Sequence, residues 1–218
     1  MPSCHCQATD DHFSDAVARR DLQRYRSRGP DRTTRLMLEA LKRSAVRDAT
    51  ILDIGGGIGV LSLELLAAGV SAATHVEAAS AYSDVAAQEA GSRGVGDRLR
   101  LVHGDAVDAD ARLPDAELVA LDRVVCCYPD WAALLNVAAK HCRRYLALSY
   151  PRDRWYVRLF VRLDNGRRRL AGNAFRTFVH PVSEMERFLT NAGFTRVDER
   201  HGLVWAVAMY ARAFEVNE

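Results

Sequence analysis

A glycine-rich loop behind an acidic residue offers the clearest chemistry in the sequence. Its glycines include Gly55, Gly57 and Gly59, and they follow an apolar run that contains Asp53. Glycine permits a tight turn and a close approach of ligand to backbone, because it carries no Cβ. The apolar helix expected directly afterwards offers free N–H groups at its start. The segment therefore predicts a ligand-binding loop between a strand and a helix.

The spacing of this loop and its acid indicate which ligand it takes. A dinucleotide-binding loop follows G-x-G-x-x-G, but Val60 occupies the place of the third glycine here. Asp53 would repel a pyrophosphate, whereas it suits the ammonium group of S-adenosylmethionine (SAM), which has no phosphate. We therefore expect SAM, and an NAD-dependent oxidoreductase is the disfavoured alternative.

Two more acids are expected at the ends of the next two strands. Glu77 lies 77 − 53 = 24 residues after Asp53, where an acid can accept hydrogen bonds from both ribose hydroxyls. Asp105 and Ala106 follow the third strand, where Asp105 can accept from an adenine amino group with the Ala106 backbone nearby. Ligands bind at the carboxyl edge of open α/β sheets, so these residues are expected to line one crevice.

Apolar periodicity predicts alternating strands and helices, which is typical of a parallel sheet covered on both faces. After Pro151 the pattern changes, and two strands separated by His201-Gly202 predict an antiparallel hairpin. The expected strands are 50–54, 73–77, 98–103, 117–122, 143–149, 194–200 and 203–211, and the expected helices are 12–28, 33–46, 58–68, 80–92, 130–140, 154–163 and 183–192.

These residues resemble the class I SAM-dependent methyltransferase family, and the likeness covers about 31–150. It implies an α/β, Rossmann-like, doubly wound and mostly parallel seven-stranded sheet with an antiparallel edge hairpin. It also implies SAM as cofactor. Its implied cofactor-binding residues are Asp53, Gly55, Gly57 and Gly59 for the methionine part, Glu77 for ribose, Asp105 and Ala106 for adenine, and Asp122 after the fourth strand.

The methyl acceptor is harder to predict. Segment 122–130 resembles methyltransferases near the magnesium-protoporphyrin O-methyltransferase type, which favours O-methylation, and its residue types suit a small-molecule acceptor. We expect this acceptor to be anionic or aromatic, because a basic insertion is expected to cover it. A hydroxyl or amine acceptor benefits from a base, whereas a carboxylate needs none. The candidate catalytic residues are Asp122, Tyr128 and His180. The alternative is an RNA-associated or non-catalytic SAM-binding module.

We expect an N-terminal helical cap at 1–48 and a SAM-binding core at 49–218 with a substrate-covering insertion at about 151–182. This insertion is basic, since segment 143–176 holds ten Arg against two Asp. Its expected helix ends at Asn165-Gly166 and places Arg154, Arg158 and Arg162 on one ridge. We expect one of these arginines to contact the acceptor, while the other faces pack on the sheet through Trp155, Tyr156, Phe160 and Leu163.

Composition fits one cytoplasmic α/β domain. The net charge of +2 does not favour nucleic acid as a partner, and no apolar run is long enough to span a membrane. Five cysteines suit a reduced protein better than a disulfide framework. We expect no metal at Cys4-His5-Cys6 or at Cys126-Cys127, and we expect the latter pair to pack as small apolar residues.

Overall fold

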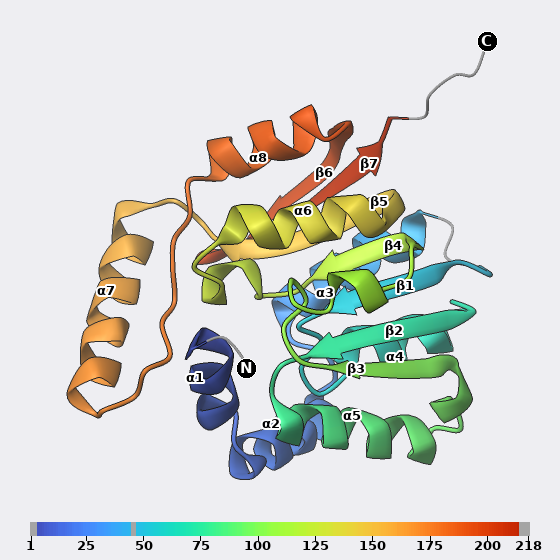
Figure 1. Ribbon diagram of the computed structural model, residues 1–218, viewed down its shortest axis with the longest axis horizontal. Coiled ribbons are helices and arrows are strands. Elements are labelled where there is room, and N and C mark those ends of the chain that lie inside the picture. Colours follow the sequence, from blue (N-terminus) through green and yellow to red (C-terminus); the bar gives the residue numbers. More distant parts are fainter. Residues whose placement is uncertain (1–3, 45–46, 214–218) are drawn as a thin grey trace.

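The computed structural model describes residues 4–44 and 47–213, with the side chains of residues 4–6 left out of the description. Its centre is a seven-stranded sheet in the order β3-β2-β1-β4-β5-β7-β6, and β7 alone runs antiparallel to its neighbours (Figure 1). The expected mostly parallel sheet with an antiparallel hairpin at one edge is confirmed. The strands are β1 (Thr50–Ile54), β2 (Ala72–Glu77), β3 (Leu99–His103), β4 (Ala116–Leu121), β5 (Cys142–Pro151), β6 (Phe194–His201) and β7 (Trp205–Arg212).

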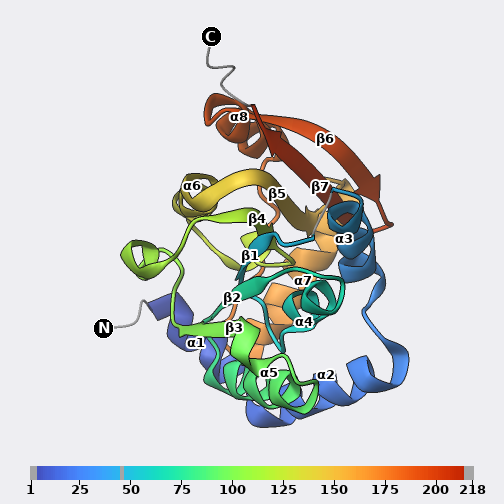
Figure 2. The same cartoon turned by 90° about the vertical axis from the view of Figure 1, so that its right-hand side faces the viewer.

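Helices cover both faces of this sheet (Figure 2). On one face, α6 and α8 pack on the sheet and form the larger hydrophobic core. On the other face, α3 and α4 pack on the sheet and form a second core. α2 packs outside α5. The α-helices are α1 (Cys4–His12), α2 (Asp15–Arg28), α3 (Arg32–Arg43), α4 (Val60–Ala67), α5 (Ser80–Ser92), α6 (Trp131–His141), α7 (Trp155–Leu170) and α8 (Val182–Asn191).

Side chains of β1 alternate between the two faces, as strand geometry requires. Leu52 and Ile54 pack in the core under α6, whereas Ile51 packs in the core under α4. Asp53 shares the face of Ile51 and is fully buried. This alternation decides where the predicted site residue Asp53 points.

The helix expected at 154–163 is longer than predicted. Asn165 and Gly166 do not end α7, which continues to Leu170. The Asn165 amide donates to the Thr177 carbonyl at 2.7 Å and accepts from the Thr177 N–H at 3.0 Å. These tertiary hydrogen bonds hold the helix against the returning chain, and tertiary contacts of this kind override local stop signals.

The expected packing of α7 is also wrong. Val157 and Val161 are its buried residues. Trp155, Phe160 and Leu163 are 76%, 62% and 62% exposed instead of lying on the sheet. The small valines take the inward face of the helix, which turns the large apolar side chains outward.

Two smaller differences lie near the ends of the chain. α1 was not expected, because its sequence has little apolar periodicity. The hairpin turn spans Gly202 to Val204 rather than His201-Gly202. The division of the chain at residue 48, into an N-terminal helical cap and a SAM-binding core, stays a prediction. α3 lies on the cap side of this division and packs directly on β5 and β7 of the sheet. No helix in the described ranges has the length and apolar character needed to cross a bilayer.

Candidate functional site

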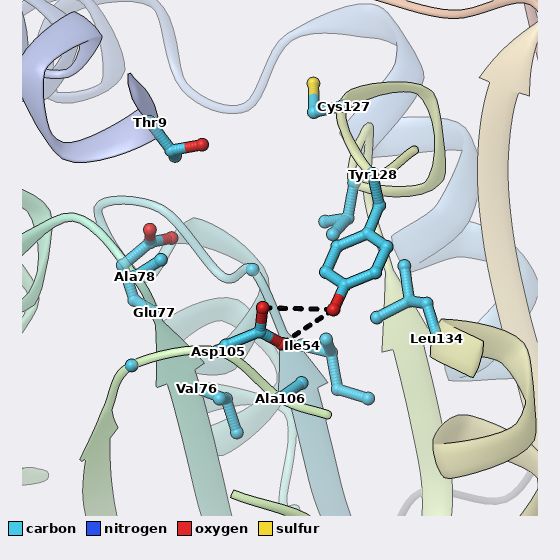
Figure 3. A pocket seen from close by; sticks show the side chains of 13 residues that line it. Thr9, Ile54, Val76, Glu77, Ala78, Asp105, Ala106, Cys127, Tyr128 and Leu134 are labelled. Atoms are coloured by element: carbon cyan, nitrogen blue, oxygen red, sulfur yellow. Dashed lines mark hydrogen bonds between the residues drawn. The ribbon is translucent and has the colours of Figure 1, made fainter. Parts of the chain in front are cut away.

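A cavity of about 450 Å³, counted with its open mouth, lies at the carboxyl ends of β1 to β4. We call the strand-end residues Gly55, Glu77 and Asp105 its floor. Figure 3 shows Glu77 and Asp105 below Thr9 of α1. Its lining comprises Thr9, Ile54, Gly55, Val76, Glu77, Ala78, Gly104, Asp105, Ala106, Val124, Cys127, Tyr128 and Leu134. Four residues predicted for cofactor binding, namely Gly55, Glu77, Asp105 and Ala106, are therefore brought together.

The glycine loop lies against the loop after β4. Gly55 has φ +64°, and a Cβ there would clash with a methyl group of Val124. Gly59 has φ +84° and forms the N-cap of α4. Both positions require glycine, because an L side chain is strained at positive φ. Gly57 and Gly59 adjoin the cavity without being among the residues that line it.

Glu77 is held at the end of β2 by backbone donors. One carboxylate oxygen accepts from the Gly57 N–H at 2.8 Å, and the other accepts from the Ala79 N–H at 2.8 Å. Burial raises the pKa of Glu77, while the backbone hydrogen bond from Ala79 and the charge of His75 act in the opposite direction. Each oxygen keeps a second lone pair, so Glu77 can still accept from a ligand hydroxyl.

Asp105 and Tyr128 form a second fixed polar group. The Tyr128 hydroxyl lies 3.0 Å from both Asp105 oxygens, as the dashed lines in Figure 3 mark. The Val107 N–H also donates to Asp105 at 2.8 Å. Tyr128, predicted as a catalytic candidate, therefore joins Asp105, predicted for adenine, on one wall of the cavity.

Asp53 lies behind the glycine loop rather than on the cavity surface. Its carboxylate accepts from the Ser62 hydroxyl of α4 at 2.7 Å, and His75 Nδ1 lies 3.8 Å away. The second Asp53 oxygen and both ring nitrogens of His75 have no hydrogen-bond partner among the described residues. The predicted contact of Asp53 with an ammonium group stays a prediction, and its observed contact supports the start of α4.

Asp122 ties the end of β4 to β5 and α3. One oxygen accepts from the Ser149 hydroxyl at 2.6 Å, and the other accepts from the Thr34 hydroxyl. Arg123 follows with φ +62° and pairs with Asp31 at 2.7 Å. Both oxygens of Asp122 are therefore engaged by other side chains, and its predicted catalytic and cofactor-binding roles stay predictions.

His180 fixes the loop that carries Tyr128. Its Nε2 lies 3.0 Å from the carbonyl oxygens of Val125 and Tyr128. Burial lowers the pKa of His180, so the neutral ring donates through Nε2 to these carbonyls. His180 is not among the residues that line the cavity. Its contacts give it a positioning role, while its predicted catalytic role stays a prediction.

The cavity has a roof that the sequence did not reveal. We define it as α1 with segment 171–181, which meet where His12 stacks on Phe175 with ring centroids 4.4 Å apart. Asn173 Nδ2 lies 3.0 Å from His12 Nδ1. Burial, and then the charge of Arg168, lower the pKa of His12. Thr9, one turn before His12, reaches the cavity, and only the docking of α1 identifies it.

The cysteines after β4 differ in their surroundings. Cys126 is buried, as expected, but Cys127 is half-buried and lines the cavity, which corrects the expectation that both pack as apolar residues. Their sulfur atoms are 3.5 Å apart. The hydrogen bond to Cys127, and then burial, raise the pKa of the Cys126 thiol. Among the described side chains, no group of three His, Cys, Asp or Glu could hold a metal ion.

Comparisons with known proteins agree on the fold. A family model described as the methyltransferase small domain matches residues 24–118. Magnesium protoporphyrin IX methyltransferase from Synechocystis PCC 6803 with bound SAH gives a TM-score of 0.71 at 15% identity, over 94% of this chain and 98% of that chain. An O-methyltransferase family protein from Burkholderia thailandensis gives 0.71 at 16% identity, over 94% and 60%. At such low sequence identity, these structural matches show a shared fold and nothing more.

A different kind of relative appears among curated proteins. Protein arginine N-methyltransferase 7 from Aedes aegypti is 40% identical over 72 residues, which is 33% of this chain and 10% of that protein. The chain thus spans about a tenth of the length of the curated relatives it matches. This shared stretch is too short to transfer an acceptor.

Proposed function

We propose that this chain, a SAM-dependent methyltransferase of the class I fold, methylates a small anionic or aromatic acceptor, preferably at an oxygen atom. The observation that carries the proposal is the cavity at the strand ends, where the glycine loop, Glu77 and Asp105 converge. Ligand sites of open α/β sheets lie in such a crevice at the carboxyl ends of the strands.

SAM is proposed to lie along the floor of this cavity. Glu77 would accept from the two ribose hydroxyls with the lone pairs that the backbone N–H groups leave. Asp105, fixed by Tyr128, would accept from the adenine amino group with Ala106 beside the ring. The glycine loop from Gly55 would approach the methionine part, and Asp53 would support that loop from behind through Ser62.

The acceptor is proposed to enter beneath the roof. Thr9 and Cys127 line that side of the cavity, and His12, one turn after Thr9, stacks on Phe175. In the transfer, the acceptor oxygen attacks the methyl carbon in line, the carbon–sulfur bond breaks, and S-adenosylhomocysteine leaves with the electron pair. A hydroxyl acceptor loses its proton to a base, whereas a carboxylate acceptor has no proton to lose. The Tyr128 hydroxyl donates to Asp105, so the predicted catalytic role of Tyr128 stays a prediction.

The charge around the roof favours an anionic or neutral acceptor over a guanidinium group. Arg168 lies over the Phe175 ring at 4.9 Å from its centroid, and Arg176 donates to backbone carbonyls of the same segment. Neither arginine lines the cavity, and Arg168 pairs with Asp164 at 2.7 Å, so their charge disfavours a cationic acceptor only weakly. The carboxylates on the floor, Glu77 and Asp105, are already assigned to the cofactor, so they are not available to bind an arginine side chain of a protein.

The test is a transfer assay with SAM labelled in its methyl group. The acceptor panel contains phenols, catechols, aromatic carboxylic acids, an arginine-rich peptide and RNA, and Glu77→Gln serves as the cofactor-site control. We expect label in a phenol or carboxylate, lost in Glu77→Gln. Label confined to the peptide or the RNA would overturn the acceptor proposed here.

A further inference from the structure

The outer face of α7 is a row of exposed apolar side chains. At about 100° per residue, Trp155, Leu159 and Leu163 fall on one stripe at i, i+4 and i+8. This stripe is opposite the buried Val157 and Val161. The most exposed apolar residues of α7 and the neighbouring hairpin turn are Trp155 (76%), Leu159 (49%), Phe160 (62%), Leu163 (62%), Leu170 (92%) and Leu203 (81%).

The stripe continues onto the hairpin turn between β6 and β7. The Tyr156 hydroxyl donates to the Leu203 carbonyl at 2.8 Å, which places that turn beside the start of α7. α7 has 16 residues, so it is about 24 Å long. Figure 1 shows it standing at the outer side of the molecule, beyond the carboxyl ends of β1 and β2. The surface is therefore a convex ridge.

Positive charges border this ridge. Arg162 and Arg169 fall beside the stripe on one side, and Arg167 falls on the other. None of these three has an ion-pair partner within residues 4–44 and 47–213. Asp164, the one acid within α7, lies toward the buried face and pairs with Arg168 at 2.7 Å. The outward half of the helix thus carries apolar groups and cations without a carboxylate.

We propose that the outer face of α7 docks on an anionic lipid surface. A helix with Trp, Phe and Leu on one face and arginines along its borders lies in the plane of a bilayer interface. Its apolar side chains enter the headgroup region while the arginines contact lipid phosphates. The proposal does not depend on the acceptor, because it rests on side chains that face away from the cavity.

Charge and shape argue against two other occupants. A second copy would bring the arginines of one α7 against those of another, and like charges across an interface are unfavourable. A peptide needs a groove for its side chains, whereas the stripe is on a protruding helix. A planar anionic surface satisfies both the apolar ridge and its cationic borders.

The first experiment measures co-sedimentation of the full chain with vesicles. Wild type should pellet with phosphatidylcholine vesicles that contain phosphatidylglycerol, and much less with phosphatidylcholine alone. The double variant Leu159→Ser with Leu163→Ser should lose about tenfold or more in vesicle affinity, because it removes two inserted side chains. The matched control Leu101→Ser changes an exposed leucine on β3 (37% exposed) and should bind as wild type does.

The second experiment tests the charges. Arg162→Glu with Arg169→Glu should abolish the preference for anionic vesicles, while Arg187→Glu on the exposed face of α8 should leave it unchanged. Circular dichroism and S-adenosylhomocysteine binding should be the same in all variants, which separates loss of docking from loss of folding. Tryptophan emission should shift to the blue with vesicles in wild type and not in Trp155→Ser.

Three results would overturn the proposal. One is wild-type protein that stays in the supernatant with anionic vesicles. Another is pelleting that the α7 variants do not reduce. The third is wild-type protein that does not bind vesicles but forms a concentration-dependent dimer, or binds an acidic peptide. The Leu159→Ser and Leu163→Ser changes would abolish that dimer or that binding.

Discussion

The floor and the roof of the cavity hold their side chains by different means. On the floor, Glu77 and Asp105 accept hydrogen bonds from backbone N–H groups at 2.8 Å, so the sheet and its loops fix their positions. In the roof, α1 meets segment 171–181 through the stacked rings of His12 and Phe175. Backbone-fixed groups suit a cofactor that is the same in every turnover, whereas the side-chain contact between α1 and segment 171–181 can change without altering the sheet.

The sharpest test of this difference compares a glycine from each part. Gly55 and Gly172 have similar φ values of +64° and +71°, but a Cβ meets Val124 only at Gly55 and has open space at Gly172. Gly55→Ala should lower the free energy of unfolding by about 2–4 kcal/mol, from clash and backbone strain together. Gly172→Ala should cost about 1–2 kcal/mol from strain alone.

Urea denaturation of both variants measures these values. If the two substitutions cost the same, the close packing of the glycine loop against Val124 does not contribute to the rigidity of the floor.

A tyrosine pair tests binding rather than stability. Tyr128→Phe removes the hydroxyl that contacts Asp105, and it should weaken S-adenosylhomocysteine binding by about 0.5–1.5 kcal/mol, or about 2- to 12-fold. Tyr156→Phe removes a hydroxyl that contacts the Leu203 carbonyl far from the floor. Calorimetric titration should show no change for Tyr156→Phe, and equal losses in both variants would contradict the assignment of Tyr128 to the cofactor wall.

The smallest expected effect is a pH dependence of opposite sign in the two parts. The pKa of His12 is lowered by burial, so the unfolded chain binds protons more tightly, and the roof loses stability as pH falls below 6.5. The pKa of Glu77 is raised by burial. The contribution of Glu77 to the stability of the floor is therefore fully present below pH 4.5, and it is lost as the pH rises through the pKa of the folded state.

His12→Phe keeps the ring on Phe175 and removes the titrating group. Thermal melting between pH 7.5 and pH 5.5, an interval chosen to bracket the ordinary histidine pKa of about 6.5, should show a smaller loss in this variant than in wild type. An unchanged slope would show that protonation of His12 does not act on the roof.

The two parts also differ in how far sequence predicts them. Strand alternation and the order of β and α segments place Glu77 and Asp105 at adjacent strand ends, because parallel strands bring their carboxyl ends to one edge. Thr9 is not predictable in this way, since it reaches the cavity only when His12 meets Phe175, a contact between distant segments. The local pattern of apolar and polar residues contains no information on how α1 packs against segment 171–181.

Two residues lie on faces that the sequence pattern does not indicate. Asp53 was expected to bind an ammonium group at the loop mouth, which stays a prediction, and its side chain lies under α4, where it accepts a hydrogen bond from Ser62. Trp155 was expected against the sheet, yet α7 turns its smaller valines inward. In each case the residue type is compatible with both faces, and packing of neighbouring elements decides which face is buried.

The central claim is that SAM lies on the floor with its ribose at Glu77. Calorimetric titration of wild type and Glu77→Gln with S-adenosylhomocysteine, and with NAD as the negative control, tests it most directly; Glu184→Gln on α8 is the matched surface control. We predict saturable S-adenosylhomocysteine binding, no NAD binding, and a loss of about 1.5–3 kcal/mol, or about 10- to 150-fold, in Glu77→Gln alone. Binding of NAD, or wild-type S-adenosylhomocysteine affinity in Glu77→Gln, would contradict the account.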